Sequence, residues 1–284
     1  MSGEIAFTNT ALESFAALVT FVLLFACIAK IKMQRGIKHV TSKNAKRNTL
    51  DYILIIWLVI HMIVLTADVL SWTAMDFGKN EVWLLFMLNL TFTCLFLECM
   101  VYTYYVKETI YQHEMIGNTY VYLVMLSTVI AIILWITSDI SGKFYYLDTQ
   151  GNYTQGSMYW LCQFYCIIVM CGNIVILLKH RKALVRHDVL SLLMYGLIPI
   201  ASIPAQMLWK STTFNLATTL ALIYICISVH MAQYDRIVEQ EKLLIQQEHE
   251  LSMNQMQMMI AQIQPHFLYN SLTALAQLCS KDPK

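Results

Sequence analysis

Long apolar runs alternate with short polar connections over the first 231 residues of the chain. A helix needs roughly 20 mostly apolar residues to cross a hydrocarbon core of about 30 Å. Seven stretches meet this requirement, at residues 11–31, 50–70, 82–106, 119–138, 158–178, 189–209 and 215–231. The pattern therefore predicts an all-α fold, a polytopic membrane bundle of seven transmembrane helices.

The pattern changes after residue 231. Residues 234–262 are rich in Glu, Gln, Lys and Met and contain no Gly or Pro, which is typical of a helix. Apolar residues recur there at every seventh position, at Ile237, Leu244, Leu251 and Met258, and one residue along at Val238, Ile245 and Met259. This repeat predicts a coiled coil that continues from the seventh span and pairs two copies in parallel. Because Glu241, Glu248 and Gln255 interrupt the second apolar column, a single amphipathic helix packed on another surface is the alternative.

Composition agrees with a membrane protein and excludes several other classes. Hydrophobic residues make up 58% of the chain and charged residues 13%, which lies outside the range of soluble domains. Lys and Arg (19) nearly balance Asp and Glu (18), so no basic excess points to nucleic acid. The eight cysteines show no C-x-x-C spacing, and all but Cys279 lie singly in apolar runs. We therefore expect small buried thiols rather than disulfides, and no metal site.

The basic residues predict an orientation in the membrane. Twelve of them fall in the connections on one side: Lys30, Lys32, Arg35, Lys38, Lys43, Lys46, Arg47, Lys107, Lys179, Arg181, Lys182 and Arg186. The opposite side has Lys79, Lys143 and Lys210. Since short cytoplasmic loops carry the excess of Lys and Arg, the N-terminus is expected outside and the tail in the cytoplasm. The longest outer connection, residues 139–157, is expected to form a small hairpin.

One motif in the tail carries recognisable chemistry. Residues 262–275 read Q-I-Q-P-H-F-L-Y-N-S-L-T-A-L. This segment resembles the phosphoacceptor segment of LytS/YehU-type sensor histidine kinases, whose signature runs close to Q-I-x-P-H-F-L-F-N-S-L-N. The matching residues are Pro265, His266, Phe267, Leu268, Asn270, Ser271 and Leu272, while Tyr269 replaces Phe and Thr273 replaces Asn. The resemblance implies that His266 accepts phosphate, and that Asn270, one helical turn further on, orients a water for dephosphorylating the partner regulator.

From the residues alone, His266 is expected roughly one turn beyond a long helix, next to Pro265, which can kink or restart the helix. An exposed imidazole on a rigid helix suits a phosphoacceptor. Phe267 and Leu268 are expected to face the dimer core. Phe267 also stands where more common kinases have an acidic residue, so the proton acceptor has no evident candidate.

The resemblance further implies a bacterial two-component system in the plasma membrane, with a homodimeric, phosphorylated kinase and a response regulator as partner. Such kinases bind ATP with Mg²⁺ on a separate domain that has glycine-rich segments. Residues 197–284 contain no glycine, so they cannot form a glycine-rich phosphate loop. The hypothesis is a kinase truncated before its ATP-binding domain, binding no cofactor and inactive in isolation. Its parts would be a sensor domain (1–231), a signalling helix (232–262) and the start of a phosphoacceptor helical hairpin (263–284).

Polar residues inside the spans suggest where a signal is received. Several lie toward the outer end and are candidates for a pocket that binds an extracellular or membrane-soluble ligand: Asp68, Trp72, Asn89, Tyr159, Gln163 and Gln206. The alternative is an interfacial aromatic belt with interhelical hydrogen bonds. His61 shares a helix face with Asp68 and with it forms a candidate pH-sensitive pair, although unrelated packing roles are favoured. Glu98 is expected to pair with Lys107 or with a basic loop.

Seven spans with an outside N-terminus also describe rhodopsins and G-protein-coupled receptors. The last span has no lysine for a retinal Schiff base, and the third ends without an Asp-Arg-Tyr-like triplet. A seven-helix receptor or transporter-like ligand-binding protein without kinase output remains the alternative function.

Overall fold

The computed structural model describes residues 3–35, 42–77, 81–111, 117–148, 153–209 and 213–281. The chain divides into two units, Met1–Val229 and His230–Lys284, and each is considered by itself.

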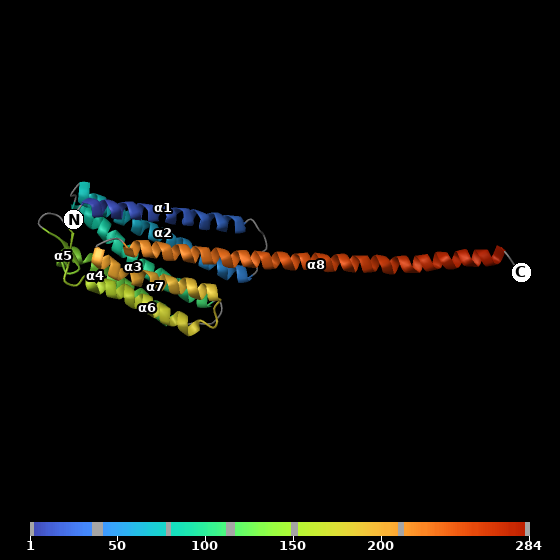
Figure 1. Ribbon diagram of the computed structural model, residues 1–284. Helices are drawn as coiled ribbons and strands as arrows, with labels where there is room; N and C mark the ends of the chain where they lie inside the picture. The colour runs from blue at the N-terminus through green and yellow to red at the C-terminus, as the bar shows by residue number, and fades with distance from the viewer. Residues whose placement is uncertain are drawn as a thin grey trace. The chain divides into compact units, whose positions relative to one another are not determined.

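The first unit is a bundle of long helices with one short helix and one small hairpin (Figure 1). Its elements are α1 (Gly3–Arg35), α2 (Ser42–Phe77), α3 (Glu81–Tyr111), α4 (Thr119–Ile136), α5 (Ser138–Ser141), β1 (Tyr145–Leu147), β2 (Tyr153–Gln155), α6 (Trp160–His180), α7 (Arg186–Trp209) and the first part of α8 (Thr213–Lys281).

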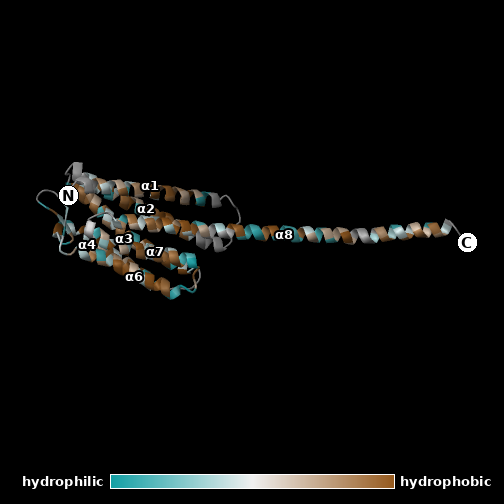
Figure 2. Cartoon of the chain, viewed as in Figure 1, coloured by the Kyte–Doolittle hydropathy of each residue, from teal (hydrophilic) through white to brown (hydrophobic). Residues whose placement is uncertain are grey.

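Seven of the described helices have segments long and apolar enough to cross a membrane: Phe7–Lys32, Thr49–Thr73, Glu81–Tyr111, Thr119–Ser141, Trp160–His180, Arg186–Gln206 and Thr213–Met231. Each overlaps one of the seven predicted spans, so the all-α membrane bundle is confirmed. Hydrophobic residues dominate these helices, whereas the rest of α8 alternates between polar and apolar positions (Figure 2).

Aromatic rings from three helices fill the centre of the bundle. Trp57 of α2 is fully buried, and its ring centroid lies 5.7 Å from that of Tyr102 of α3 and 4.5 Å from that of Tyr195 of α7. The Tyr102 hydroxyl donates to the carbonyl oxygen of Leu192 at 2.8 Å, which gives this buried polar group its partner. By contrast, only 17% of the most apolar window of α1 is buried within the unit, against 50% for α3. Helix α1 therefore lies at the periphery, with apolar side chains left for lipid.

The hairpin predicted in residues 139–157 is present. Strands β1 and β2 pair antiparallel, with Tyr146 opposite Thr154. The Ser138 hydroxyl fixes its first strand, because Oγ accepts from the N–H groups of Phe144 and Tyr145 at 3.0 and 2.9 Å and donates to the Tyr145 carbonyl oxygen at 3.0 Å. Gly142, with φ of +62°, ends α5 in the left-handed conformation that glycine adopts most readily.

The second unit consists of the remainder of α8, which is helical to Lys281. His266 was expected about one turn beyond a long helix, and this expectation is wrong, because both Pro265 and the backbone of His266 lie inside α8. Proline removes one backbone donor, and the strong helix formers on both sides of it support continuation. The apolar residues of the seven-residue repeat are exposed in this unit, with Ile237, Leu244 and Leu251 at 58%, 61% and 59%. Their pairing in a coiled coil stays a prediction.

Candidate functional site

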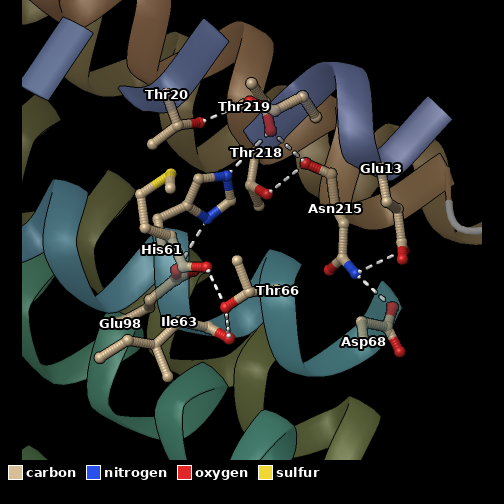
Figure 3. Close-up of polar contacts among 12 residues, drawn as sticks. Glu13, Thr20, His61, Ile63, Thr66, Asp68, Glu98, Asn215, Thr218 and Thr219 are labelled. Carbon is tan, nitrogen blue, oxygen red and sulfur yellow. Dashed lines mark hydrogen bonds and ion pairs between the residues drawn. The ribbon is translucent and has the colours of Figure 1, made fainter. Parts of the chain in front are cut away.

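His61 lies at the centre of a buried polar network that joins α1, α2, α3 and α8 (Figure 3). Its Nδ1 is 2.8 Å from Oε1 of Glu98 on α3, and its Nε2 is 2.8 Å from Oγ1 of Thr219 on α8. His61 is fully buried and Glu98 is 2% exposed. Because both ring nitrogens have partners, the orientation of the imidazole is fixed. Removing one partner of a buried hydrogen bond costs about 1–3 kcal/mol, so this contact matters to the bundle.

The structure corrects the expectation for Glu98 and gives His61 and Asp68 separate partners. Glu98 does not pair with Lys107, whose Nζ lies 3.5 Å from Oε2 of Glu108 instead. Glu98 and Lys107 are nine positions apart on one helix, or about 13 Å along its axis, which is too far for contact. His61 and Asp68 share a helix but no hydrogen-bond partner. His61 contacts Glu98 and Thr219. Asp68 accepts from Asn215 of α8 and, within α2, from Ser71.

Asn215 continues the network one turn before Thr219. Its Nδ2 donates to Oε1 of Glu13 on α1 at 3.1 Å and to Oδ2 of Asp68 on α2 at 2.8 Å. Its backbone carbonyl oxygen accepts from the hydroxyls of Thr218 and Thr219, each at 2.8 Å (Figure 3). Glu13 is fully buried. The first turns of α8 are therefore held to α1 and α2 by hydrogen bonds, and to α3 through His61.

A second polar group holds the hairpin. The Tyr145 hydroxyl lies 2.8 Å from Oδ1 of Asn89 and also contacts the Asp139 carboxylate, and Asn89 Nδ2 donates to Asp139 Oδ2 at 3.1 Å. Burial, with the hydrogen bond to Asp139, raises the pKa of Tyr145 above its ordinary value. The phenol thus stays protonated and keeps its donor.

The predicted ligand-binding residues make contacts of several kinds. Asp68 and Asn89 take part in the two groups just described, and Gln163 Nε2 lies 3.4 Å from the Tyr159 hydroxyl. Trp72 Nε1 and Gln206 Oε1 are buried and have no hydrogen-bond partner within the described residues. A ligand pocket formed by all six stays a prediction.

The motif of the tail occupies one stretch of α8. The side chain of His266 lies outside the described residues. Around it, Phe267, Leu268 and Tyr269 are 70%, 62% and 73% exposed. Asn270 is also exposed and lies four positions after His266, so the two residues belong to the same face of the helix. Large apolar side chains left uncovered next to a histidine are what a helix that pairs with another surface would present.

Residues 254–284 match the histidine kinase family model. The matched stretch contains both His266 and Asn270. A search of the curated proteins gives no match. The chain thus combines a helical membrane domain with a segment that supports membership of the histidine kinase family.

Sequence reasoning missed Glu13 and Thr219. Glu13 is an acidic residue inside an apolar stretch, which by itself indicates an internal partner, but it stands close to the predicted start of the first span. Thr219 gives no such signal, because threonine is common in membrane helices and usually bonds to its own backbone. Only the packing of α8 against α2 identifies it as a partner of His61.

Proposed function

We propose that this chain is the sensor, signalling-helix and phosphoacceptor part of a membrane histidine kinase of a bacterial two-component system. One observation carries the proposal. The segment that matches the histidine kinases includes P-H-F-L-Y-N-S-L and belongs to the same helix, α8, as the seventh span. A ligand or other signal would act on the bundle, and α8 would transmit the change to His266.

The finer features of the proposal come from sequence. The signature around His266 favours the LytS/YehU type, with His266 as phosphoacceptor and Asn270 positioning water for dephosphorylation. The basic connections favour an outside N-terminus and a cytoplasmic tail. ATP with Mg²⁺ would be bound by a domain other than residues 1–284, and phosphate would pass from His266 to an aspartate of a response regulator.

The homodimer is supported by the exposed apolar repeat of α8. Ile237, Leu244, Leu251 and Met258 recur at the spacing of a coiled-coil seam and are each 58–61% exposed. Phe267 and Leu268 extend the exposed apolar surface into the motif. A second copy of the same helix would cover these side chains.

The test compares His266→Gln with His249→Gln in the full-length gene product. His249 is an exposed histidine of the same helix and serves as the matched control. Membranes are supplied with labelled ATP, and acid-labile phosphate on the protein is measured. We expect His266→Gln to abolish labelling and His249→Gln to retain it. Labelling that survives His266→Gln would contradict the role given to His266, and no labelling of the wild type would favour a receptor or transporter-like protein without kinase output.

A further inference from the structure

We propose that His61 and Glu98 form a proton-binding site whose occupancy is communicated to the seventh span by the Thr219 hydroxyl. The proposal deepens the proposed function by naming the proton as a signal of the sensor domain, and its effect on phosphorylation rests on that function. The binding site itself rests only on the geometry of the bundle.

The hydrogen bonds can be satisfied by two protonation states of the pair, and the first holds two protons. The Thr219 hydroxyl has one hydrogen, which it donates to the Asn215 carbonyl oxygen at 2.8 Å. In this state its oxygen accepts from His61, so Nε2 carries a hydrogen. The 2.8 Å contact between His61 Nδ1 and Glu98 Oε1 needs a second hydrogen between the two atoms. With two protons the pair is electrically neutral overall, whether the second one belongs to the ring or to the carboxyl group.

Loss of one proton to water changes this pattern. The remaining ring hydrogen is needed on Nδ1, since an unprotonated Nδ1 would face the Glu98 carboxylate with no hydrogen between them. Nε2 then becomes an acceptor, so the Thr219 hydroxyl must turn from the Asn215 carbonyl and donate to His61. Asn215 keeps the hydroxyl of Thr218 at 2.8 Å. Loss of one proton therefore removes a hydrogen bond inside α8 and reverses the direction of the hydrogen bond between α8 and α2.

This exchange acts on the shape of the seventh span. A threonine hydroxyl bonded to the carbonyl four residues earlier often bends a helix, and releasing it removes that influence. Because Thr219 and the motif of the tail belong to one helix, a change at Thr219 is a change in the element that contains His266.

The surroundings of the pair favour its neutral form. Residues 213–229 of α8 contain no Asp, Glu, Lys or Arg. Glu13 of α1 and Asp68 of α2 approach α8 through Asn215, and the groups near Glu98 are Tyr195 of α7 and the α3 residues Cys94 and Cys99. These groups are acidic or neutral. In the described part of the chain, the basic side chain that contacts Glu98 is His61. No other charge recorded among the described residues of this setting would balance a net negative charge on the pair, so a change in its protonation must be accommodated by the hydrogen bonds of His61 and Thr219.

The binding site can be tested without any kinase activity. Infrared difference spectra of the chain in lipid nanodiscs are recorded between about pH 5 and pH 9, the range in which histidine is the usual titrating group. We expect imidazole and carboxyl bands to titrate in the wild type and to be lost in His61→Gln and in Glu98→Gln. The controls His249→Gln and Glu81→Gln, both at exposed positions, should retain them. Bands that are unchanged by both buried substitutions would overturn the site.

Thr219 variants test the communication step and avoid the buried pair. Thr219→Val removes the hydroxyl and keeps the branched shape, while Thr219→Ser keeps the hydroxyl. In the full-length protein in vesicles, we expect phosphate on the protein to change several-fold with pH in the wild type and in Thr219→Ser. The phosphate on Thr219→Val should depend much less on pH. Any pH dependence that remains in this variant belongs to the kinase chemistry itself.

Failure of this inference differs from failure of the proposed function. A wild-type profile identical to that of Thr219→Val, with normal labelling of His266, would overturn the communication step and leave the kinase intact. No labelling of His266 at any pH would overturn the kinase, while the infrared titration would still decide whether His61 and Glu98 bind a proton.

Discussion

At the scale of single residues, Ser138 anchors the start of the hairpin through its hydroxyl. Ser138 is 1% exposed, and its hydroxyl bonds to the N–H groups of Phe144 and Tyr145 and to the carbonyl oxygen of Tyr145. We expect Ser138→Ala to leave the N–H groups of Phe144 and Tyr145 without acceptors, at a cost of about 2 kcal/mol. Hydrogen exchange in detergent should show faster exchange of these two amides. Ser141→Ala, at an exposed position, is the control, and equal exchange in both variants would contradict the role given to Ser138.

The sequence shows which polar residues of the spans need hydrogen-bond partners, but it does not show which residues those partners are. His61, Asp68 and Glu98 stand out because polar groups in a membrane span need internal partners. Their partners could not be identified, since Glu98 and Thr219 lie 37 and 158 positions from His61 along the chain. The charge of Lys107 made it a candidate partner of Glu98, but nine residues of helix separate the two side chains by too great a distance for contact.

At the scale of the helix, the seven-residue repeat of α8 gives a direct test of pairing. We expect Leu251→Glu to place a charge in the predicted seam and weaken the dimer at least tenfold, because burying an unpaired charge is unfavourable. Met253→Glu adds the same charge about 200° around the helix from Leu251 and is the control. Sedimentation of the full-length protein in detergent measures the association. Equal dimerisation of both variants would favour the alternative of a single amphipathic helix.

The spans were the most predictable elements of the fold. In a bilayer, every backbone N–H and C=O group of a crossing segment must find its hydrogen-bond partner within the protein. A long apolar run is therefore expected to form a helix. Helix ends were less predictable. Helix α2 begins at Ser42 and ends at Phe77, well beyond the predicted span of residues 50–70, since polar residues extend a helix outside the hydrocarbon region as readily as they form a loop. The helix through Pro265 shows the same difficulty at a residue that usually marks an end.

For the whole molecule, the division into a membrane bundle and a polar tail was readable from composition alone, and the structure adds that one helix belongs to both. Residues 213–231 of α8 form a span, and residues 254–281 of the same helix lie within the histidine kinase match. A rotation or bend of a continuous helix changes the direction of every later side chain. For signalling, the direction in which the side chains of α8 point around its axis (its phase) should therefore matter more than the length of the helix.

Insertions between Gln240 and Glu241 separate phase from length. Seven helix-forming residues turn the helix through about 700°, which restores nearly the original direction and keeps the repeat, whereas two residues turn it through about 200°. We expect the longer insertion to retain regulated phosphorylation of the full-length protein in membranes, and the shorter one to lock phosphate on His266 in a high or a low state. If the two-residue insertion were regulated as well as the seven-residue one, α8 would not transmit a signal by its rotation, and a change in the dimer as a whole would have to carry it.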